Sequence, residues 1–245
     1  TYQQLMNAGV NLTNIDPRNI QIFSKGKEQP IYIEGESDGT FDGNDFIELY
    51  CEHNDGWYDN ELFSDSAHAL NPYYSMFSDT AFYFLTWNNL ISNVRMVSEV
   101  DLDFNAYNVS PYFWNEVKLV GKSNYNHGQT TSAGYAFPEY SNGEGWYDSQ
   151  VNAQKSSTKT LSTPFKKSGA PDGWVKTRIA GRGAYSHYVE VSYNDSMIYK
   201  GNFFDKATVT VDFPLRMDWV EDASTIKYNS VTPIFNWRDR FGIAY

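Results

Sequence analysis

The feature that most constrains this fold is a series of short stretches in which apolar and polar residues alternate. They lie at residues 19–24, 29–34, 46–51 and 80–87, and again at 174–181, 186–193, 196–203 and 207–215. Alternation with a period of two is typical of strands with one face on a core, and turn residues separate the stretches. Aromatic residues make up 17% of the chain, which suits strands. Because no amphipathic helices alternate with these stretches, we expect an all-β protein of antiparallel β-sandwich units.

Two segments depart from this pattern. The start of the chain has Tyr2, Leu5, Met6 and Val10 at helical spacing, with Gly9 as a stop, which predicts one short N-terminal helix. The Ser- and Lys-rich residues 149–171 fit either a linker or a long edge connection, since they also contain apolar side chains.

The charge is distributed unevenly along the 245 residues. Residues 1–120 hold 18 of the 30 acids but only 5 of the 19 bases. We therefore expect two units, an acidic β domain over residues 1–115 that carries a DGxxDxxD loop, and a second β-sandwich over residues 116–245. The net charge of -11 disfavours nucleic acid and anionic membranes as partners. No apolar window is long enough for membrane insertion.

The reactive side chains are few. Cys51 is the single cysteine, so an internal disulfide and a cysteine-built zinc site are excluded, and we expect it to be a packing residue of a strand. The four histidines are scattered without the close pairing of a zinc or catalytic motif. We expect them to be structural.

The acidic stretch IEGESDGTFDGNDFIELY, residues 33–50, is the strongest candidate site. Residues 34–45 can be laid on the twelve positions of a calcium loop, with Gly39 at the sharp turn. Glu34 and Glu36 stand where Asp or Asn is usual, and strands flank the loop where helices are expected, so only part of the pattern fits. The candidate calcium ligands are Asp38, Thr40 through its carbonyl, Asp42, Asn44 and Asp45.

The alternative is an empty, solvated hairpin tip with turns at Asp38-Gly39 and Gly43-Asn44. Catalysis is disfavoured, because acid/base work needs one carboxyl buried and another exposed. Under the first interpretation calcium is the one cofactor, and under the second there is none.

The aromatic residues suggest a second kind of site. Exposed Trp and Tyr rings can stack on sugars, and Trp57 and Trp146, which share the motif Gly-Trp-Tyr-Asp, are the candidate ligand-binding residues. A sugar platform requires several of Trp57, Trp87, Trp146 and Trp174 to lie exposed and coplanar on one face. The alternative is that cores and seams use these rings.

The segments AGVNLTNIDPRNIQIFSKGKEQPIYIEGESDGTFDGNDFIELYCEHNDGWYDNELF and LNPYYSMFSDTAFYFLTWN carry a resemblance. They resemble the region ahead of the catalytic domain in gingipain-type cysteine peptidases of Bacteroidetes, especially the sortase-like component of type IX secretion. That family has a DPRNI turn, a DG-F--GD-IEFYG segment and a Tyr-rich NPYYS-F-DT--YFLTW segment. The match is specific over residues 8–90, and GEGWYDS, LSTPF, RIAGRG and HYVEVSYN resemble more loosely the jelly-roll-like sandwich that follows in the same proteins.

This resemblance implies a noncatalytic N-terminal scaffold or recognition region of a secreted or cell-envelope bacterial protein. Its partners would be the downstream peptidase domain of the same chain and proteins of the secretion system. The family's catalytic His and Cys lie further along, so we expect no enzyme activity in these residues. Cys51 stands where the family has glycine, which argues against a role in function. We also expect both ends of the sequence to be cuts inside a longer protein. The alternative function is a carbohydrate-binding module.

Overall fold

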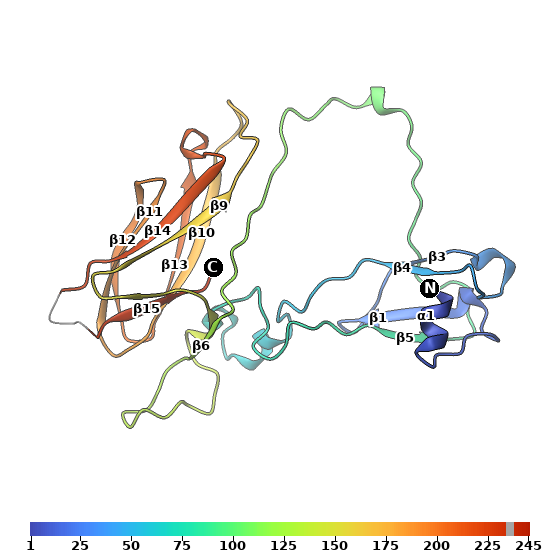
Figure 1. The fold of residues 1–245 in the computed structure, drawn as a ribbon, viewed down its shortest axis with the longest axis horizontal. Coiled ribbons are helices and arrows are strands. Elements are labelled where there is room, and N and C mark those ends of the chain that lie inside the picture. Colours follow the sequence, from blue (N-terminus) through green and yellow to red (C-terminus); the bar gives the residue numbers. More distant parts are fainter. Residues whose placement is uncertain (234–237) are drawn as a thin grey trace. The chain divides into compact units, whose positions relative to one another are not determined.

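The computed structural model describes residues 1–233 and 238–245, and these form two compact units. Unit 1 consists of residues 1–54 and 78–108, and unit 2 of residues 55–77 and 109–245 (Figure 1). The sequence suggested one cut near residue 115, whereas residues 55–77 of the acidic half belong to unit 2. The protein is all-β and antiparallel, with the single short α-helix that the sequence predicts.

Unit 2 is built on two four-stranded antiparallel sheets with the orders β13-β10-β15-β8 and β12-β11-β14-β9. The strands are β8 Gln150–Asn152, β9 Ser156–Ser162, β10 Gly173–Gly181, β11 Ser186–Tyr193, β12 Ser196–Phe204, β13 Thr208–Leu215, β14 Ala223–Ser230 and β15 Arg240–Ile243. The chain crosses between the sheets at most connections, and the resulting order of strands is that of a jelly roll. The expected jelly-roll-like sandwich is confirmed for this unit.

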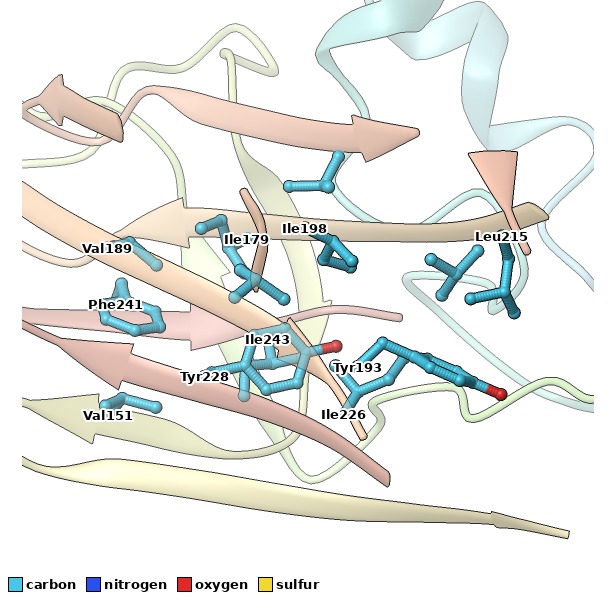
Figure 2. Packing of buried hydrophobic residues seen from close by; sticks show 13 residues of the cluster. Val151, Ile179, Val189, Tyr193, Ile198, Leu215, Ile226, Tyr228, Phe241 and Ile243 are labelled. Carbon is cyan, nitrogen blue, oxygen red and sulfur yellow. The ribbon is translucent and has the colours of Figure 1, made fainter. Parts of the chain in front are cut away.

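The core of unit 2 lies between the two sheets (Figure 2). Along β11, Val189, Val191 and Tyr193 are buried while the residues between them are more exposed, as the alternating sequence predicts. Ile226 and Tyr228 of β14 and the residues of β10 and β15 complete the same cluster.

The rest of unit 2 lies outside the two four-stranded sheets. The hairpin of β6 Asn124–His127 and β7 Glu144–Tyr147 leads into β8. Short 3-10 turns lie at Asp59–Leu62, Ser66–His68 and Met217–Trp219. Leu70 packs with Tyr147, Ala180 and Ala244 in a small buried cluster, which ties residues 55–77 to this unit.

Unit 1 is small and has two layers. Its elements are α1 Tyr2–Asn7, β1 Ile20–Ser24, β2 Lys27–Glu28, β3 Ile31–Ile33, β4 Ile47–Leu49 and β5 Phe84–Trp87, with 3-10 turns at Pro17–Asn19, Glu36–Asp38 and Phe104–Ala106. The sheets β2-β1-β5 and β3-β4 share one core, in which Ile20 and Ile22 of β1 pack with Ile31 and Ile33 of β3. Thr1 and Gln4 form a capping box that starts α1.

Three local expectations can be compared with these elements. The alternating stretches at residues 19–24 and 29–34 predict a hairpin with each other. A hairpin does form after β1, with Lys25 and Gly26 both in the left-handed region, but residues 31–33 pair with β4 and not with β1. The acidic stretch does connect two antiparallel strands. Residues 149–171 contain β8 and β9, each at the edge of a sheet, so they are an edge connection and not a linker.

The expectation for Cys51 is wrong. Its thiol is exposed, because β4 ends at Leu49 and the alternation that seemed to run through residue 51 does not continue as a strand.

Candidate functional site

Unit 2 contains a large groove at one side of its sandwich. Its volume is about 1090 Å³, slightly above the usual range for pockets that bind small molecules. One wall is the extended segment 109–121, and the other is the start of β10, residues 173–176. Ala244 and Tyr245, which follow β15, lie at the groove between these walls.

Within the described residues, neither wall has a strand partner on the side that faces the groove, although β13 pairs with β10 on its other side. In the part of the chain that the structure describes, β15 pairs with β10 only over Ile179–Gly181, and residues 109–120 make no backbone-to-backbone hydrogen bond. Gly121 is the first residue of that segment to pair, through its N–H to the Ala244 carbonyl oxygen at 2.7 Å. In Figure 1 the segment passes beside the C-terminus of the chain.

The floor of the groove is aliphatic. It includes Leu161, Val175, Leu215, Ile226 and Ile243, of which all but Leu161 are buried. These side chains belong to the core of the sandwich or pack against it, so the groove reaches the space between the two sheets. Such a floor suits apolar side chains, since a buried hydroxyl without a hydrogen-bond partner is costly.

Lysines surround the opening, although the chain as a whole is acidic. The groove is lined by Lys118, Lys159, Lys166, Lys167 and Lys176, with Glu116 and Asp148 as the acids. The Ser123 hydroxyl and the Lys159 ammonium hold the pKa of Asp148 below its usual range. Lys118, Lys159 and Lys176 pair with Glu116, Asp148 and Asp212. The excess positive charge at the opening therefore comes from Lys166 and Lys167, which complement acidic groups on a ligand.

Two indole rings, one from each wall, meet at the groove. The centroids of Trp114 and Trp174 are 5.6 Å apart with the rings tilted by 42°, and the side chains are 57% and 66% exposed. Tyr112 contacts Trp114 edge to face. Sequence reasoning did not pair Trp114 with Trp174, because the two residues lie 60 positions apart.

The predicted ligand residues Trp57 and Trp146 both lie in unit 2 but outside this groove. Trp57 is 46% exposed and contacts Tyr58. Trp146 is half-buried, donates from Nε1 to the Met76 carbonyl oxygen at 3.3 Å and packs against Tyr125. Trp87 belongs to unit 1. Their role in sugar binding stays a prediction.

In the acidic loop of unit 1, the carboxylates accept hydrogen bonds from backbone N–H groups of the same loop. Asp38 accepts from the Thr40 N–H at 2.8 Å, and Asp45 from the Asp42 N–H at 2.8 Å. Asp42 accepts from the Asn44 N–H at 3.4 Å. Asp45 is buried. Over residues 1–233 and 238–245, no three His, Cys, Asp or Glu side chains converge as a metal site. Calcium binding by Asp38, Thr40, Asp42, Asn44 and Asp45 stays a prediction.

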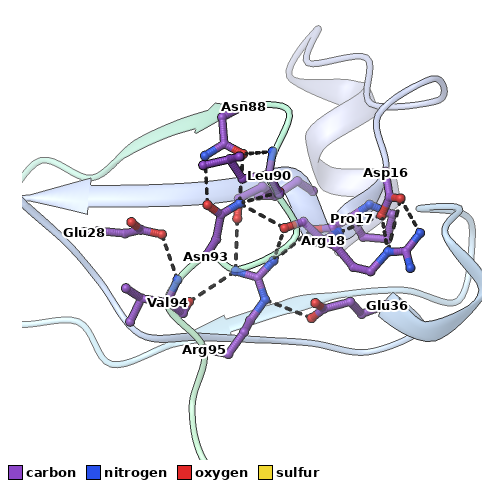
Figure 3. A network of polar contacts seen from close by, with 11 residues as sticks. Asp16, Pro17, Arg18, Glu28, Glu36, Asn88, Leu90, Asn93, Val94 and Arg95 are labelled. Atoms are coloured by element: carbon purple, nitrogen blue, oxygen red, sulfur yellow. Dashed lines mark hydrogen bonds and ion pairs between the residues drawn. The ribbon is translucent and has the colours of Figure 1, made fainter.

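Glu36, at the third position of the proposed calcium loop, pairs with Arg95 (Figure 3). Arg95 Nε donates to Glu36 Oε2 at 2.9 Å, and its other nitrogens donate to the carbonyl oxygens of Pro17, Arg18, Ile20 and Val94. Asp16 accepts from Arg18 in the same region. Sequence reasoning missed Arg95, whose only signal is that it is the single base between residues 28 and 117.

A second buried polar cluster lies in unit 2. Asp239 contacts His187 Nδ1 and accepts from the Thr232 hydroxyl, and all three residues are fully buried or nearly so. His187 Nε2 faces the Asp205 carbonyl oxygen at 2.7 Å, and a carbonyl can only accept, so Nε2 holds a proton. Both ring nitrogens of His187 are thus engaged inside the core, as a structural role for this histidine requires.

No helix of the described residues is both long enough and apolar enough to cross a membrane.

No protein-family model matches this sequence, and no curated protein matches it. Solved structures that are similar to the chain include two carbohydrate-binding modules and a longer protein. The carbohydrate-binding module CBM36, solved with calcium and xylotriose, is 11% identical with a TM-score of 0.28, over 51% of this chain and 92% of that module. A family 35 carbohydrate-binding module from an environmental isolate is 19% identical with a TM-score of 0.27, over 52% of this chain and 88% of that module.

The third is the dimeric latent form of PorU from Porphyromonas gingivalis. It is 11% identical with a TM-score of 0.49, over the whole of this chain and 22% of PorU, so the chain spans about a fifth of that protein. Because all three TM-scores lie below 0.5, we infer the function from this chain's own residues.

Proposed function

We propose that this chain is a noncatalytic scaffold and recognition region of a secreted or cell-envelope bacterial protein, of the gingipain-like, type IX sortase kind. Its role is to hold another part of the same polypeptide, the downstream peptidase domain. Chemistry then belongs to that domain and not to these residues.

The groove of unit 2 is the observation that carries this proposal. It combines an aliphatic floor, a basic opening and two walls with unpaired backbone groups, at the point where the chain reaches Tyr245. Such a surface is suited to polypeptide, because main-chain hydrogen bonds can form on the walls while alternate side chains enter the floor. The motifs shared over residues 8–90 support the choice of family.

The experiment is a binding measurement between residues 1–245 and the separately produced polypeptide that follows Tyr245 in the full-length protein. We expect saturable binding by calorimetry, weakened at least tenfold by Leu161→Lys in the groove. The matched control is Leu62→Lys, an exposed leucine of unit 2 outside the groove. Absence of binding, or an equal loss with both variants, contradicts the proposal.

A second candidate function is glycan binding, which the exposed pair Trp114 and Trp174 favours. Exposed aromatic rings with apolar faces can stack on sugar rings. The aliphatic floor is the argument against it, since it offers no partners to sugar hydroxyls. A glycan array separates the two candidates: binding that is lost in Trp174→Ala supports a lectin-like role, and a blank array removes it.

A further inference from the structure

The groove has the geometry of a missing strand. At the end of β15, the Ala244 N–H donates to the Arg178 carbonyl oxygen and the Arg178 N–H donates to the Tyr245 carbonyl oxygen, each at 2.9 Å. On its other side, the Ala244 carbonyl oxygen accepts from Gly121. Ala244, the residue after β15, is therefore held between β10 and Gly121 of the segment 109–121.

Beyond that point, within the described residues, neither neighbour has a strand partner on the side that faces the groove, although β10 pairs with β13 on its other side. Backbone polar groups alternate sides along a strand, so the N–H and C=O groups of Lys176 and Trp174 point to the same side as those of Arg178. This side of β10 faces away from β13, and in the described ranges no strand covers it along residues 173–176. Unpaired apolar edges of this kind are sites of aggregation that proteins normally cover.

We propose that the groove holds one further β-strand, formed by the residues that follow Tyr245 in the full-length protein as a direct continuation of β15. This inference rests on the proposed function and deepens it, because it names the segment that the groove holds. The strand pairs with Trp174 and Lys176 on one side and with segment 109–120 on the other.

Continuity with β15 is the reason to choose this occupant. Ala244 already lies between both walls, so the next residues enter the groove without a loop and without the entropy cost of closing one. A strand from elsewhere would have to start directly against Tyr245. The groove floor also predicts its sequence: alternate residues are aliphatic, and the lysines at the opening favour acids among the others.

The register follows from the existing pairs. Ile179 pairs with Ile243, and antiparallel pairing advances by one residue on each strand. Trp174 lies five positions before Ile179, so its partner is the third residue after Tyr245. The Arg178 N–H, however, donates to the Tyr245 carbonyl oxygen and not to that of Ala244, which places one extra residue on the strand that continues β15. With this bulge kept, the partner of Trp174 is the fourth residue after Tyr245.

Thermal unfolding of an extended chain gives the first test. The protein is produced as residues 1–245 and as the same chain with the ten natural residues that follow. We expect a midpoint at least about 4 °C higher in the extended chain, since a change of that size corresponds to roughly 1 to 2 kcal/mol for a domain of this length. Proline at the third and fifth added positions removes two donors and should abolish the gain. An unchanged midpoint, or a gain that survives proline, overturns the inference.

Disulfide trapping tests the register in the extended chain with Cys51→Ser. Trp174→Cys is combined with a cysteine at the third or at the fourth added position. We expect a disulfide from one of the two and not from both, because neighbouring strand residues face opposite sides. Equal trapping at both positions, or at neither, overturns the register; if the variants fail to fold, the proline comparison decides.

These results separate the two proposals. If the downstream polypeptide binds, but the added residues neither raise the unfolding midpoint nor form a disulfide with Trp174→Cys, the proposed strand is wrong and the scaffold role stands. If neither occurs, or if the full-length protein ends at Tyr245, both are wrong.

Discussion

At the residue scale, the pair of His187 and Asp239 is the most demanding feature of the jelly-roll unit. Both side chains are fully buried, and Thr232 and the Asp205 carbonyl satisfy the remaining polar atoms. Removing one partner leaves a buried polar group without compensation, whereas an exposed pair contributes little.

We therefore predict that Asp239→Ala lowers the free energy of unfolding of unit 2 by about 3 to 5 kcal/mol. Asp212→Ala is the control, since Asp212 pairs with Lys176 at 3.8 Å and both are exposed; its cost should be at most about 1 kcal/mol. Urea unfolding measures both, and equal effects would contradict a structural role for the buried pair.

Tyr228 gives a prediction in alkaline solution. Burial raises its pKa to about 12, from an ordinary value of 10.0. Between these two values the unfolded chain loses the phenolic proton first, so the stability contributed by the neutral phenol is complete below pH 10 and is lost as pH rises toward 12.

Tyr228→Phe removes this dependence together with the hydrogen bond to Thr177 at 2.7 Å. The variant should be about 1 kcal/mol less stable than the parent at pH 8. It should equal or exceed the parent at about pH 11 to 12, because two pKa units correspond to about 2.7 kcal/mol. Urea unfolding across this range tests the crossing, with Tyr135→Phe, an exposed tyrosine of unit 2, as control. Parallel curves would contradict it.

At the scale of elements, Arg95 acts as a clamp in unit 1. It joins residues 93–95 to the 3-10 turn Pro17–Asn19 and, through Glu36, to the acidic stretch (Figure 3). Asn93 supports the same connection by donating to the Arg18 carbonyl oxygen at 2.9 Å.

We predict that Arg95→Ala destabilises unit 1 by about 2 kcal/mol, because charge-assisted hydrogen bonds to several acceptors are lost. Arg95→Lys should recover only part of this, since one ammonium cannot reach all the carbonyls. The control is Arg216→Ala, whose exposed pair with Asp218 should cost at most about 1 kcal/mol. Hydrogen exchange of β1 and β5 reports the effect; unchanged protection in Arg95→Ala would contradict the clamp.

The strands themselves could be predicted to very different degrees. β10 to β13 are long and alternate clearly, and the sequence predicted all four. β15 was missed, because Arg240–Ile243 is short and Phe241, Gly242 and Ile243 are all buried, which hides any alternation. β3 was recognised but its partner was not, because the alternation within one strand does not show which other strand it pairs with.

At the scale of the whole molecule, the two units have separate cores, one built around Ile20, Ile22, Ile31 and Ile33, and the other between the jelly-roll sheets. The boundary could not be read from charge, because residues 55–77 are acidic like unit 1 but pack through Leu70 with Tyr147.

We predict two unfolding transitions in calorimetry. Ile20→Ala should lower the midpoint of one and Ile179→Ala that of the other, each costing about 2 to 5 kcal/mol, because both side chains are fully buried in different cores. The two variants serve as controls for each other. A single transition that both variants shift would contradict the division into two units.

The proposed calcium loop is tested on the same protein by titration calorimetry. Saturable heat with calcium that disappears in Asp42→Ala would support the loop, and no heat in the parent would remove it. Because Asp38, Asp42 and Asp45 already bind backbone N–H groups, a bound ion must use their remaining lone pairs.

The sequence by itself determined the all-β class, the short N-terminal helix, most long strands and the hairpin nature of the acidic stretch, because each depends on local periodicity and turn residues. Only the tertiary structure decided which strands pair, that Arg95 forms an ion pair with Glu36, that residues 55–77 belong to unit 2, and that the rings of Trp114 and Trp174 are in contact. These depend on contacts between residues far apart in the chain, and local alternation carries no information about them. The groove beside Tyr245 is of this second kind, since its walls come from residues 109–121 and 173–176 and its floor from the core.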